Sequence, residues 1–316
     1  MPIHSADNLK DCEGLVTIGD WLRWTYSRFN EHELFFGHGS DNSWDEACHL
    51  VLQALELPWD FDASLYHCRL TETEKRRLHT LVQCRIEQRM PTPYLLNKAW
   101  FCDLPFYVDE RVLVPRSPIA ELIRNGFQPW MGHTPVNRIL DLCTGSGCIG
   151  IACAESYQEA QVDLLDLSSD ALEVANINID RFSLWDRVQT IKSDLFSALS
   201  EREKKPRYQI IVTNPPYVDA EDMSDLPEEY HHEPELGLTA GHDGLDLARI
   251  ILREARDYLT DDGILVMEVG NSCFALDEAF PDVPFTWVEF EQGGHGVCLL
   301  TAADLDRYRD SFAVGA

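Results

Sequence analysis

Short apolar runs and longer amphipathic segments alternate along the second half of the chain. The runs are rich in β-branched residues, which predicts buried strands, whereas the longer segments carry apolar residues at helical spacing. The expected strands are residues 138–143, 162–166, 188–194, 208–213, 264–269, 285–291 and 297–301. The expected helices are residues 149–157, 170–182 and 244–259. This alternation favours a parallel, doubly wound α/β sheet.

The last two apolar runs differ from the others in what joins them. They are separated by Gly293-Gly294-His295-Gly296, and a glycine-rich turn between two β-type runs predicts a hairpin. We therefore expect a mostly parallel, seven-stranded sheet whose last strand is antiparallel.

The first part of the chain has a different texture. Helices are expected over residues 17–36, 43–55 and 71–89. Ser43 with Glu46, and Thr71 with Glu74, match the capping-box pattern that opens a helix. We expect a small helical domain over residues 1–90, and recruitment of the substrate is a hypothesis for its role.

Prolines punctuate the next segment, which we interpret as a linker over residues 91–117. Short apolar runs at 106–108 and 111–114 flank an acidic turn and predict a β-hairpin. Ser117 and Pro118 then suit the start of a helix over residues 119–126. The domain that contains the sheet is expected to span residues 118–316.

The charge balance bears on partners. The chain has 26 basic and 54 acidic residues, a net charge of -28. Binding of nucleic acid rests on Lys and Arg, so no direct nucleic-acid specificity is expected. An acidic surface attracts a basic partner and speeds the encounter. Solubility, or a salty cytoplasm, explains the charge equally well.

Several classes of site and location are not expected. The ten cysteines include no C-x-x-C pair, and Cys143, Cys148 and Cys153 recur every five residues, which is not a zinc-ligand spacing. Buried thiols in a reducing compartment are the better interpretation. The polar amino terminus predicts no secretory signal, and no run approaches the roughly 18 apolar residues of a membrane span. We expect a cytoplasmic protein without a metal site.

The strand expected at 208–213 ends at Asn214-Pro215-Pro216-Tyr217. In an open α/β sheet, ligands bind at the carboxyl ends of the strands. Prolines donate no hydrogen bond, so carbonyl groups beside them stay free to accept one. The Asn214 oxygen with such a carbonyl forms a pair of acceptors that suits an NH2 group. The alternative is an ordinary Pro-Pro turn that leaves a strand.

Three further strand ends suggest a second ligand. Asp141-Leu142-Cys143-Thr144-Gly145-Ser146-Gly147 reads as a strand end, a glycine turn and the approach to a helix start, which favours close backbone approach and an anionic group. Asp166 ends the next strand, where a carboxylate can bond ribose hydroxyls. Asp194 and Leu195 end the third and could bracket an adenine. Either aspartate could instead cap a helix. Together the ends predict an adenosyl ligand beside an amide-reading pocket.

These motifs resemble those of the class I S-adenosylmethionine-dependent methyltransferases that modify glutamine side chains. The stretch Glu233-Pro234, Gly237-Leu238 and Gly241-His242-Asp243-Gly244-Leu245 is similar to that glutamine family in particular. One branch methylates peptide chain release factors, and another methylates large-subunit ribosomal protein three. Residues 108–123 and Cys143 resemble the second branch. The resemblance covers residues 90–305 well and the helical segment more loosely.

The resemblance implies S-adenosylmethionine as cofactor and a basic ribosomal protein as partner. Asp141 and the backbone of Thr144, Gly145, Ser146 and Gly147 would hold the methionine part, Asp166 the ribose, and Asp194 with Leu195 the adenine. Asn214, Pro215, Pro216 and Tyr217 would grip the glutamine. Of these, Asn214, Pro215 and Tyr217 would act in catalysis, and Asn214 would also border the cofactor.

Rival functions remain. A DNA amino-methyltransferase uses a similar Pro-Pro motif, but it should carry a basic face. A release factor is the rival substrate, and a non-catalytic ribosome assembly factor is the rival of a different class. His231, His232 and Glu233 resemble a metal cluster, yet adjacent histidines in a loop rarely face one ion, so a lid that faces the substrate is favoured. The oligomeric state is not indicated.

Overall fold

The computed structural model describes residues 12–58, 60–219, 223 and 226–314, which fall into two compact units. The helical unit comprises Met1–Lys98 and Pro227–His232, and the sheet unit comprises Ala99–Leu226 and Glu233–Ala316, as far as they are described. The chain thus passes from the sheet unit to the helical unit after Leu226 and returns at Glu233. Residues 1–11, from which the absence of a signal was argued, lie outside the described residues.

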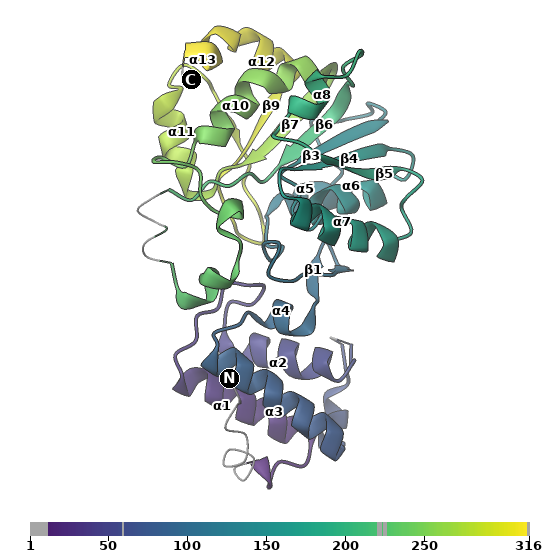
Figure 1. The fold of residues 1–316 in the computed structure, drawn as a ribbon, viewed down its shortest axis with the longest axis vertical. Coiled ribbons are helices and arrows are strands. Elements are labelled where there is room, and N and C mark those ends of the chain that lie inside the picture. Colours follow the sequence, from purple (N-terminus) through teal and green to yellow (C-terminus); the bar gives the residue numbers. More distant parts are fainter. Residues whose placement is uncertain (1–11, 59, 220–222, 224–225, 315–316) are drawn as a thin grey trace. The chain divides into compact units, whose positions relative to one another are not determined.

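The helical unit packs its helices around one apolar core. Its elements are α1 (Ile18–Glu31), α2 (Ser43–Ala54), α3 (Glu72–Glu87) and α4 (Thr92–Leu96), with the 3-10 turns η2 (Ala63–His67) and η3 (Glu228–His232) (Figure 1). Trp21, Phe29, Leu50 and Leu78 are fully buried in the core. The capping box at Thr71 and Glu74 is confirmed. The one expected at Ser43 is wrong, because the Asn42 side chain caps α2 from one residue earlier.

A buried ion pair holds η3 within the helical unit. Arg85 is almost completely buried, and its guanidinium donates to Glu46 at 2.5 Å, to Glu229 at 3.1 Å and to the Phe35 carbonyl at 2.7 Å. Breaking such a network by removing one partner leaves an uncompensated buried charge. The turn η3 is therefore firmly part of this unit.

The sheet unit contains a seven-stranded sheet in the order β5-β4-β3-β6-β7-β9-β8. The pairs among β3 to β7 are parallel, and β9 is antiparallel to both β7 and β8. This confirms the expected mostly parallel sheet with an antiparallel last strand. The bounds are β3 (Arg138–Leu142), β4 (Gln161–Asp166), β5 (Val188–Lys192), β6 (Tyr208–Thr213), β7 (Leu259–Glu268), β8 (Thr286–Trp287) and β9 (Val297–Thr301).

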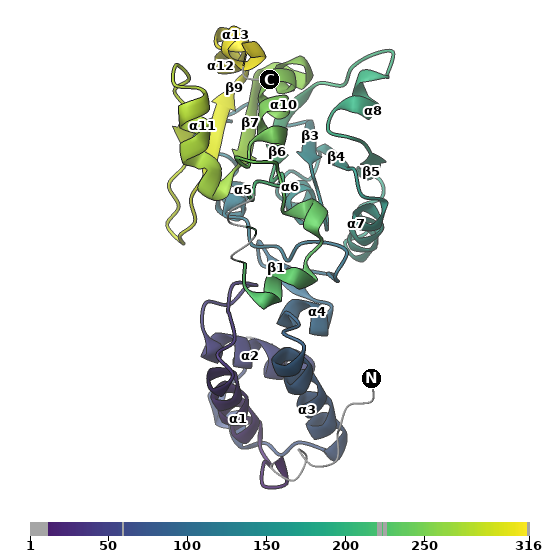
Figure 2. The same ribbon diagram turned by 60° about the vertical axis from the view of Figure 1, so that its left-hand side comes forward.

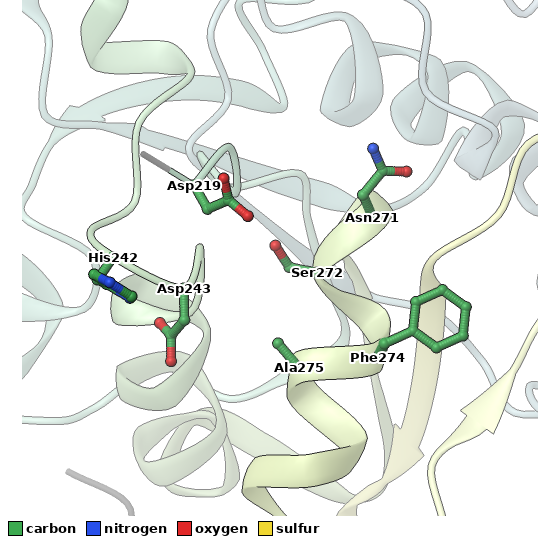
Figure 3. Close-up of a pocket in the computed structure, with 7 residues that line it drawn as sticks. All are labelled: Asp219, His242, Asp243, Asn271, Ser272, Phe274 and Ala275. Carbon is green, nitrogen blue, oxygen red and sulfur yellow. The ribbon is translucent and has the colours of Figure 1, made fainter. Parts of the chain in front are cut away.

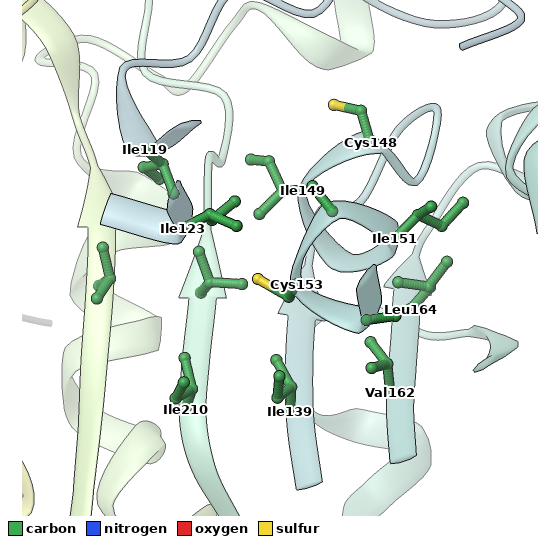
Figure 4. Packing of buried hydrophobic residues seen from close by; sticks show 14 of the residues in the cluster. Ile119, Ile123, Ile139, Cys148, Ile149, Ile151, Cys153, Val162, Leu164 and Ile210 are labelled. Carbon is green, nitrogen blue, oxygen red and sulfur yellow. The ribbon is translucent and has the colours of Figure 1, made fainter. Parts of the chain in front are cut away.

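Helices cover both faces of the sheet, as a doubly wound fold requires (Figure 1 and Figure 2). Successive strand residues point to opposite faces, so Ile139 packs on one side and Leu140 on the other. Figure 4 shows Ile139 and Ile210 directed toward Ile123 and Cys153 of two covering helices. The first face carries α5 (Ile119–Arg124), α6 (Cys148–Ser156) and α7 (Ser169–Arg181). The second carries α8 (Ser197–Ser200), α10 (Asp246–Glu254), η5 (Ala255–Tyr258), α11 (Cys273–Ala279), α12 (Ala302–Arg307) and α13 (Arg309–Val314).

The β-hairpin expected around Asp109 and Glu110 is wrong. The hairpin pairs β1 (Ala99–Phe101) with β2 (Leu104–Phe106), and its turn residues Cys102 and Asp103 have φ of 49° and 63°. Positive φ at both positions is the geometry of a tight two-residue hairpin. After β2, the Tyr107 backbone bonds the Asn178 side chain instead of a second strand.

Some elements end earlier than expected, because a side chain forms hydrogen bonds with the backbone there in place of a neighbouring strand. β8 stops at Trp287, and the N–H groups of Glu291 and Gln292 donate to the Glu121 carboxylate instead of a strand. The expected domain limits of 90, 117 and 118 differ from the observed units, since the hairpin belongs to the sheet unit and η3 to the helical unit. The recruiting role of the helical unit stays a prediction.

All ten cysteines are free thiols, of which Cys12, Cys148, Cys153 and Cys298 are buried and Cys68 is exposed. The expectation of buried thiols therefore holds for only part of the set. Among the described residues, every helix is too short or too polar to cross a bilayer.

Candidate active site

The sheet register brings the predicted site residues to one edge. Leu142 pairs with Leu165 of β4 and with Thr213 of β6, and Asp166 pairs with Lys192 of β5. The residues that follow these pairs therefore emerge together at the carboxyl ends of four adjacent parallel strands. This edge is where an open α/β sheet binds ligands.

Asp141 organises the glycine turn from inside the sheet. Its Oδ2 accepts from the Thr144 hydroxyl at 2.5 Å and from the Gly150 N–H at 2.9 Å, so it joins the turn to the first turn of α6. The side chain is fully buried, and this desolvation raises the pKa of Asp141 to about 7. Its Oδ1 is buried and has no hydrogen-bond partner among the described residues. That oxygen is free to accept from a ligand.

Asp166 closes the next part of the edge. Its Oδ2 accepts from the Gly145 N–H at 2.9 Å, and its Oδ1 accepts from the Ser168 N–H at 2.8 Å. Desolvation raises the pKa of Asp166, although these backbone donors oppose the rise. The glycine turn and the acid predicted to work with it are thus brought into direct contact.

The two glycines of the turn serve different purposes. Gly147 has φ of 80°, and a Cβ there would lie 3.2 Å from both Ile151 and Leu164, so glycine permits close packing of α6 on the sheet. Gly145 has φ of 55°, and a Cβ there would meet nothing within 4 Å. Its backbone therefore borders open space. The first N–H groups of α6 lack partners within the helix and suit a carboxylate.

Cys143 shows why the turn tolerates few residue types. Its φ is 56°, in the left-handed region that favours glycine. Strained backbone of this kind gathers at functional sites, at a cost of about 1–3 kcal/mol per residue. Leu195 at the end of β5 has φ of 43° and shares this feature.

Asp194 and Leu195 reach the edge in different environments. The Asp194 side chain is exposed, while Leu195 is buried in the core on the second face of the sheet. The Ser193 hydroxyl donates to the Leu195 carbonyl at 2.6 Å and holds this turn. An acid open to solvent beside a fixed apolar side chain is compatible with the predicted adenine position.

The side-chain oxygen of Asn214 is a hydrogen-bond acceptor at the start of the Asn214–Tyr217 loop. Its Oδ1 is buried and has no hydrogen-bond partner among the described residues. The loop is anchored just before it, where the Thr213 hydroxyl donates to the Leu142 carbonyl at 2.9 Å. Leaving a buried polar atom unpaired costs about 1–3 kcal/mol, so the arrangement favours a ligand that donates to this oxygen.

Tyr217 is held at three points by the end of β7 and the turn η6 (Gly270–Ser272). Its hydroxyl donates to Glu268 Oε1 at 3.0 Å, and its carbonyl accepts from the Ser272 hydroxyl at 2.9 Å. A Cβ on Gly270 would lie 2.5 Å from the ring. The position of Tyr217 is therefore determined by the end of β7 and by η6 as well as by its own loop.

Sequence reasoning missed two residues of this site. Asn178 on α7 is fully buried and donates to the carbonyls of Tyr107 and Ser146. Glu268 is buried at the end of β7 and also accepts from the Ser117 hydroxyl at 2.5 Å. Asn178 could have been noticed as an amide next to the apolar Ile179 on a helical stripe. Glu268 is an acid that ends an apolar strand, as Asp166 does.

A hollow of about 560 Å³ opens beside the Tyr217 end of the loop. Ser272 and Ala275 project into it from η6 and α11, whereas the Phe274 ring turns to the other side of α11 (Figure 3). Asp243 on its wall forms an ion pair with Arg249 at 2.5 Å. The lining comprises Asp219, His242, Asp243, Asn271, Ser272, Phe274 and Ala275.

The residues suspected of mimicking a metal cluster lie in different units. His231 and His232 belong to η3 of the helical unit, and Glu233 belongs to the sheet unit. His232 Nε2 lies 2.7 Å from the Gln88 carbonyl oxygen. Among the described residues, His, Cys, Asp and Glu form no group of three or more that could hold a metal ion.

Two known proteins match nearly the whole chain, and a family model matches its central part. Residues 128–229 match the Methyltransferase small domain family. The ribosomal protein uL3 glutamine methyltransferase of Francisella tularensis is 51% identical over 299 residues, 94% of each chain. The chain belongs to the family of ribosomal protein uL3 glutamine methyltransferases. The same enzyme of Neisseria gonorrhoeae is 48% identical over 92% of this chain and 96% of that one. The solved structure of a human methyltransferase 10 domain containing protein aligns with a TM-score of 0.45 and 17% identity, over 73% of this chain and 96% of that chain.

Membership of the uL3 glutamine methyltransferase family confirms the resemblance noted in the sequence. The two stretches that carried it are in direct contact within the sheet unit. Arg116 donates to both oxygens of the buried Glu233 carboxylate, at 2.6 and 2.7 Å, and the Val114 N–H donates to it at 2.9 Å. The segment before α5 is thus fastened to the Glu-Pro stretch of the family.

Proposed function

We propose that this protein transfers a methyl group from S-adenosylmethionine to the side-chain amide nitrogen, N5, of a glutamine in ribosomal protein uL3. The relatives that match nearly the whole length of the chain are named ribosomal protein uL3 glutamine methyltransferases. The observation that carries the chemistry is the buried, unpartnered Oδ1 of Asn214 at the carboxyl end of β6. An amide NH2 group has the two donors that such an acceptor and a neighbouring carbonyl require.

The residues present fit S-adenosylmethionine. The unpartnered Oδ1 of Asp141 suits a donor, and the first N–H groups of α6 suit a carboxylate. Thr144, Gly145, Ser146 and Gly147 would therefore hold the methionine part, beside Asp141. Asp166 would take the ribose hydroxyls, and Asp194 and Leu195 would flank the adenine. When bound, S-adenosylmethionine supplies an electrophilic methyl group on a sulfonium.

The protein's task is to make an amide nitrogen reactive. Its lone pair is delocalised, and full loss of that conjugation would cost about 18–20 kcal/mol, the rotation barrier of an amide. Asn214 Oδ1 and the Pro215 carbonyl would accept the two amide hydrogens. These bonds orient the nitrogen and stabilise the positive charge that grows on it. Pro216 keeps the loop rigid, and Tyr217 forms one wall of the pocket for the substrate amide. The methylated amide then loses its proton to water.

The acidic balance of the chain supports a basic protein partner. A net charge of -28 attracts a basic ribosomal protein and repels DNA. The hollow beside Tyr217 would receive residues that flank the glutamine. We place the reaction in the cytoplasm, where ribosomal proteins are made.

The test offers radiolabelled S-adenosylmethionine with uL3, a release factor or DNA, and mass spectrometry locates the methyl group. We expect label on one glutamine of uL3. Asn214→Ala should lower kcat by about 10²–10³-fold, the usual effect of losing one preorganised polar group, and should keep cofactor affinity. The exposed Asn137→Ala is the matched control. Label on the release factor or DNA alone would overturn the substrate, and full turnover by Asn214→Ala would overturn the role of that side chain.

A further inference from the structure

Glu268 is a buried carboxylate at the substrate edge of the sheet that no step above uses. Its side chain is 5% exposed, at the last residue of β7. A charge in such a place is costly unless it is paired or well hydrogen-bonded. Desolvation raises the pKa of Glu268, while the two hydroxyl donors and the charge of Arg116 oppose the rise.

Both carboxylate oxygens of Glu268 are taken by hydroxyl groups from distant parts of the chain. Oε1 accepts from Tyr217 at 3.0 Å, and Oε2 accepts from Ser117 at 2.5 Å. The Ser117 oxygen also accepts from the Ile119 N–H at 3.2 Å, so its own proton is committed to Glu268 at the start of α5. Glu268 therefore joins the segment before α5 to the Asn214–Tyr217 loop.

The loop is fixed at both ends, and at its Tyr217 end Glu268 accepts a hydrogen bond from the Tyr217 hydroxyl. At the other end, Thr213 is bonded to β3. Asn214 and Pro215 lie between these two anchors. A shift of Tyr217 would therefore move the two acceptors proposed to orient the glutamine amide, and small misplacements of reacting groups are costly in rate.

We propose that Glu268 is a positioning residue for methyl transfer. Its carboxylate, oriented by Ser117, fixes the Tyr217 hydroxyl and through it the Asn214 and Pro215 oxygens. Ser117 lies within residues 108–123, the stretch that distinguishes the ribosomal-protein branch by resemblance. This inference rests on the proposed function for the chemistry that the loop performs.

The test is a double-mutant cycle of Glu268→Gln and Tyr217→Phe, with kcat, KM for uL3 and cofactor affinity measured for each variant. A hydrogen bond to a charged group is worth about 1.5–3 kcal/mol, so we expect each single variant to lose about ten- to a hundredfold in kcat. Cofactor affinity should stay within about twofold of wild type. If both act through one bond, the double variant should be no slower than the worse single variant. Ser117→Ala should give a smaller loss of the same kind, and the exposed Glu278→Gln is the matched control.

Two kinetic results would overturn the inference. Unchanged kcat in Glu268→Gln would show that the carboxylate does not position the loop. Losses that multiply in the double variant would show that the two residues act independently. Should uL3 prove not to be the substrate, the proposed function fails, and the same cycle is measured with whichever protein is methylated.

If no substrate is found, an NMR measurement that needs no turnover tests the inference. The side-chain amide NMR signals of Asn214 should shift in Glu268→Gln and in Tyr217→Phe, because both variants release the loop. The signals of Asn176 on α7 serve as the internal reference. Unshifted Asn214 signals in both variants would overturn the inference.

Discussion

Replacing Asn178 by Ala should destabilise the glycine turn that is proposed to hold the cofactor. The Asn178 amide donates to the Ser146 carbonyl at 2.8 Å and to the Tyr107 carbonyl at 3.0 Å, and its oxygen accepts from the Tyr107 N–H at 2.7 Å. One side chain on α7 therefore holds both the glycine turn and the segment after β2. Removing it leaves three backbone groups without these partners.

The size of the effect follows from where these groups lie. The bond to Ser146 is fully buried, so its loss costs the desolvation of a carbonyl, about 1–3 kcal/mol. The two bonds to Tyr107 are partly buried, so water can replace them, and each contributes about 0.5–1.5 kcal/mol. The free energy of unfolding should fall by about 2–6 kcal/mol. Affinity for S-adenosylmethionine should fall as well, because Ser146 lies in the turn proposed to hold it.

The assay is urea unfolding together with calorimetric titration of S-adenosylmethionine. Asn178→Asp keeps the acceptor for Tyr107 but removes both donors, so it should be at least as damaging as Asn178→Ala. The control is Asn176→Ala on the same helix, whose side chain accepts one bond from Thr190. If Asn178→Ala matched that control in both stability and affinity, the proposed support of the glycine turn would be refuted.

Two further predictions concern the acid beneath the turn and the hollow beside the loop. Because the pKa of Asp141 is raised from 3.8 to about 7 in the folded protein, the folded state binds more protons, and this contribution to stability is lost as pH rises between these values. Wild type should therefore lose about 2–3 kcal/mol more than the D141N variant between pH 5 and 8 in urea unfolding, and equal slopes would contradict the assignment. Ala275→Phe should fill the hollow and raise KM for uL3 several-fold with cofactor affinity unchanged. Ala279→Phe on the same helix is its control, and an equal rise of KM in both would argue against substrate contact there.

Local patterns in the sequence were sufficient for the class of fold and for the residues at the strand ends. The β-branched runs, the helical spacing between them and the Gly and Pro residues are properties of neighbours in the chain, and they act through backbone geometry and side-chain periodicity. The alternation of runs and helices therefore predicted the doubly wound sheet, and the strand ends predicted where Asp141, Asp166 and Asn214 emerge. The β1–β2 hairpin was not predicted at its true place, because its tight turn at Cys102 and Asp103 contains no glycine.

The tertiary structure alone decided which side chains support the site. Asn178 lies 71 positions from Tyr107 along the chain, and Glu268 lies 151 positions from Ser117. Contacts between residues so far apart depend on how α7 and α5 pack on the sheet, and no local spacing encodes them. The same holds for η3, which follows the substrate loop in sequence but is held by Arg85 in the helical unit. The strand-end acids and amide could be named from the chain itself, whereas the groups that orient them became visible only once packing had brought distant segments together.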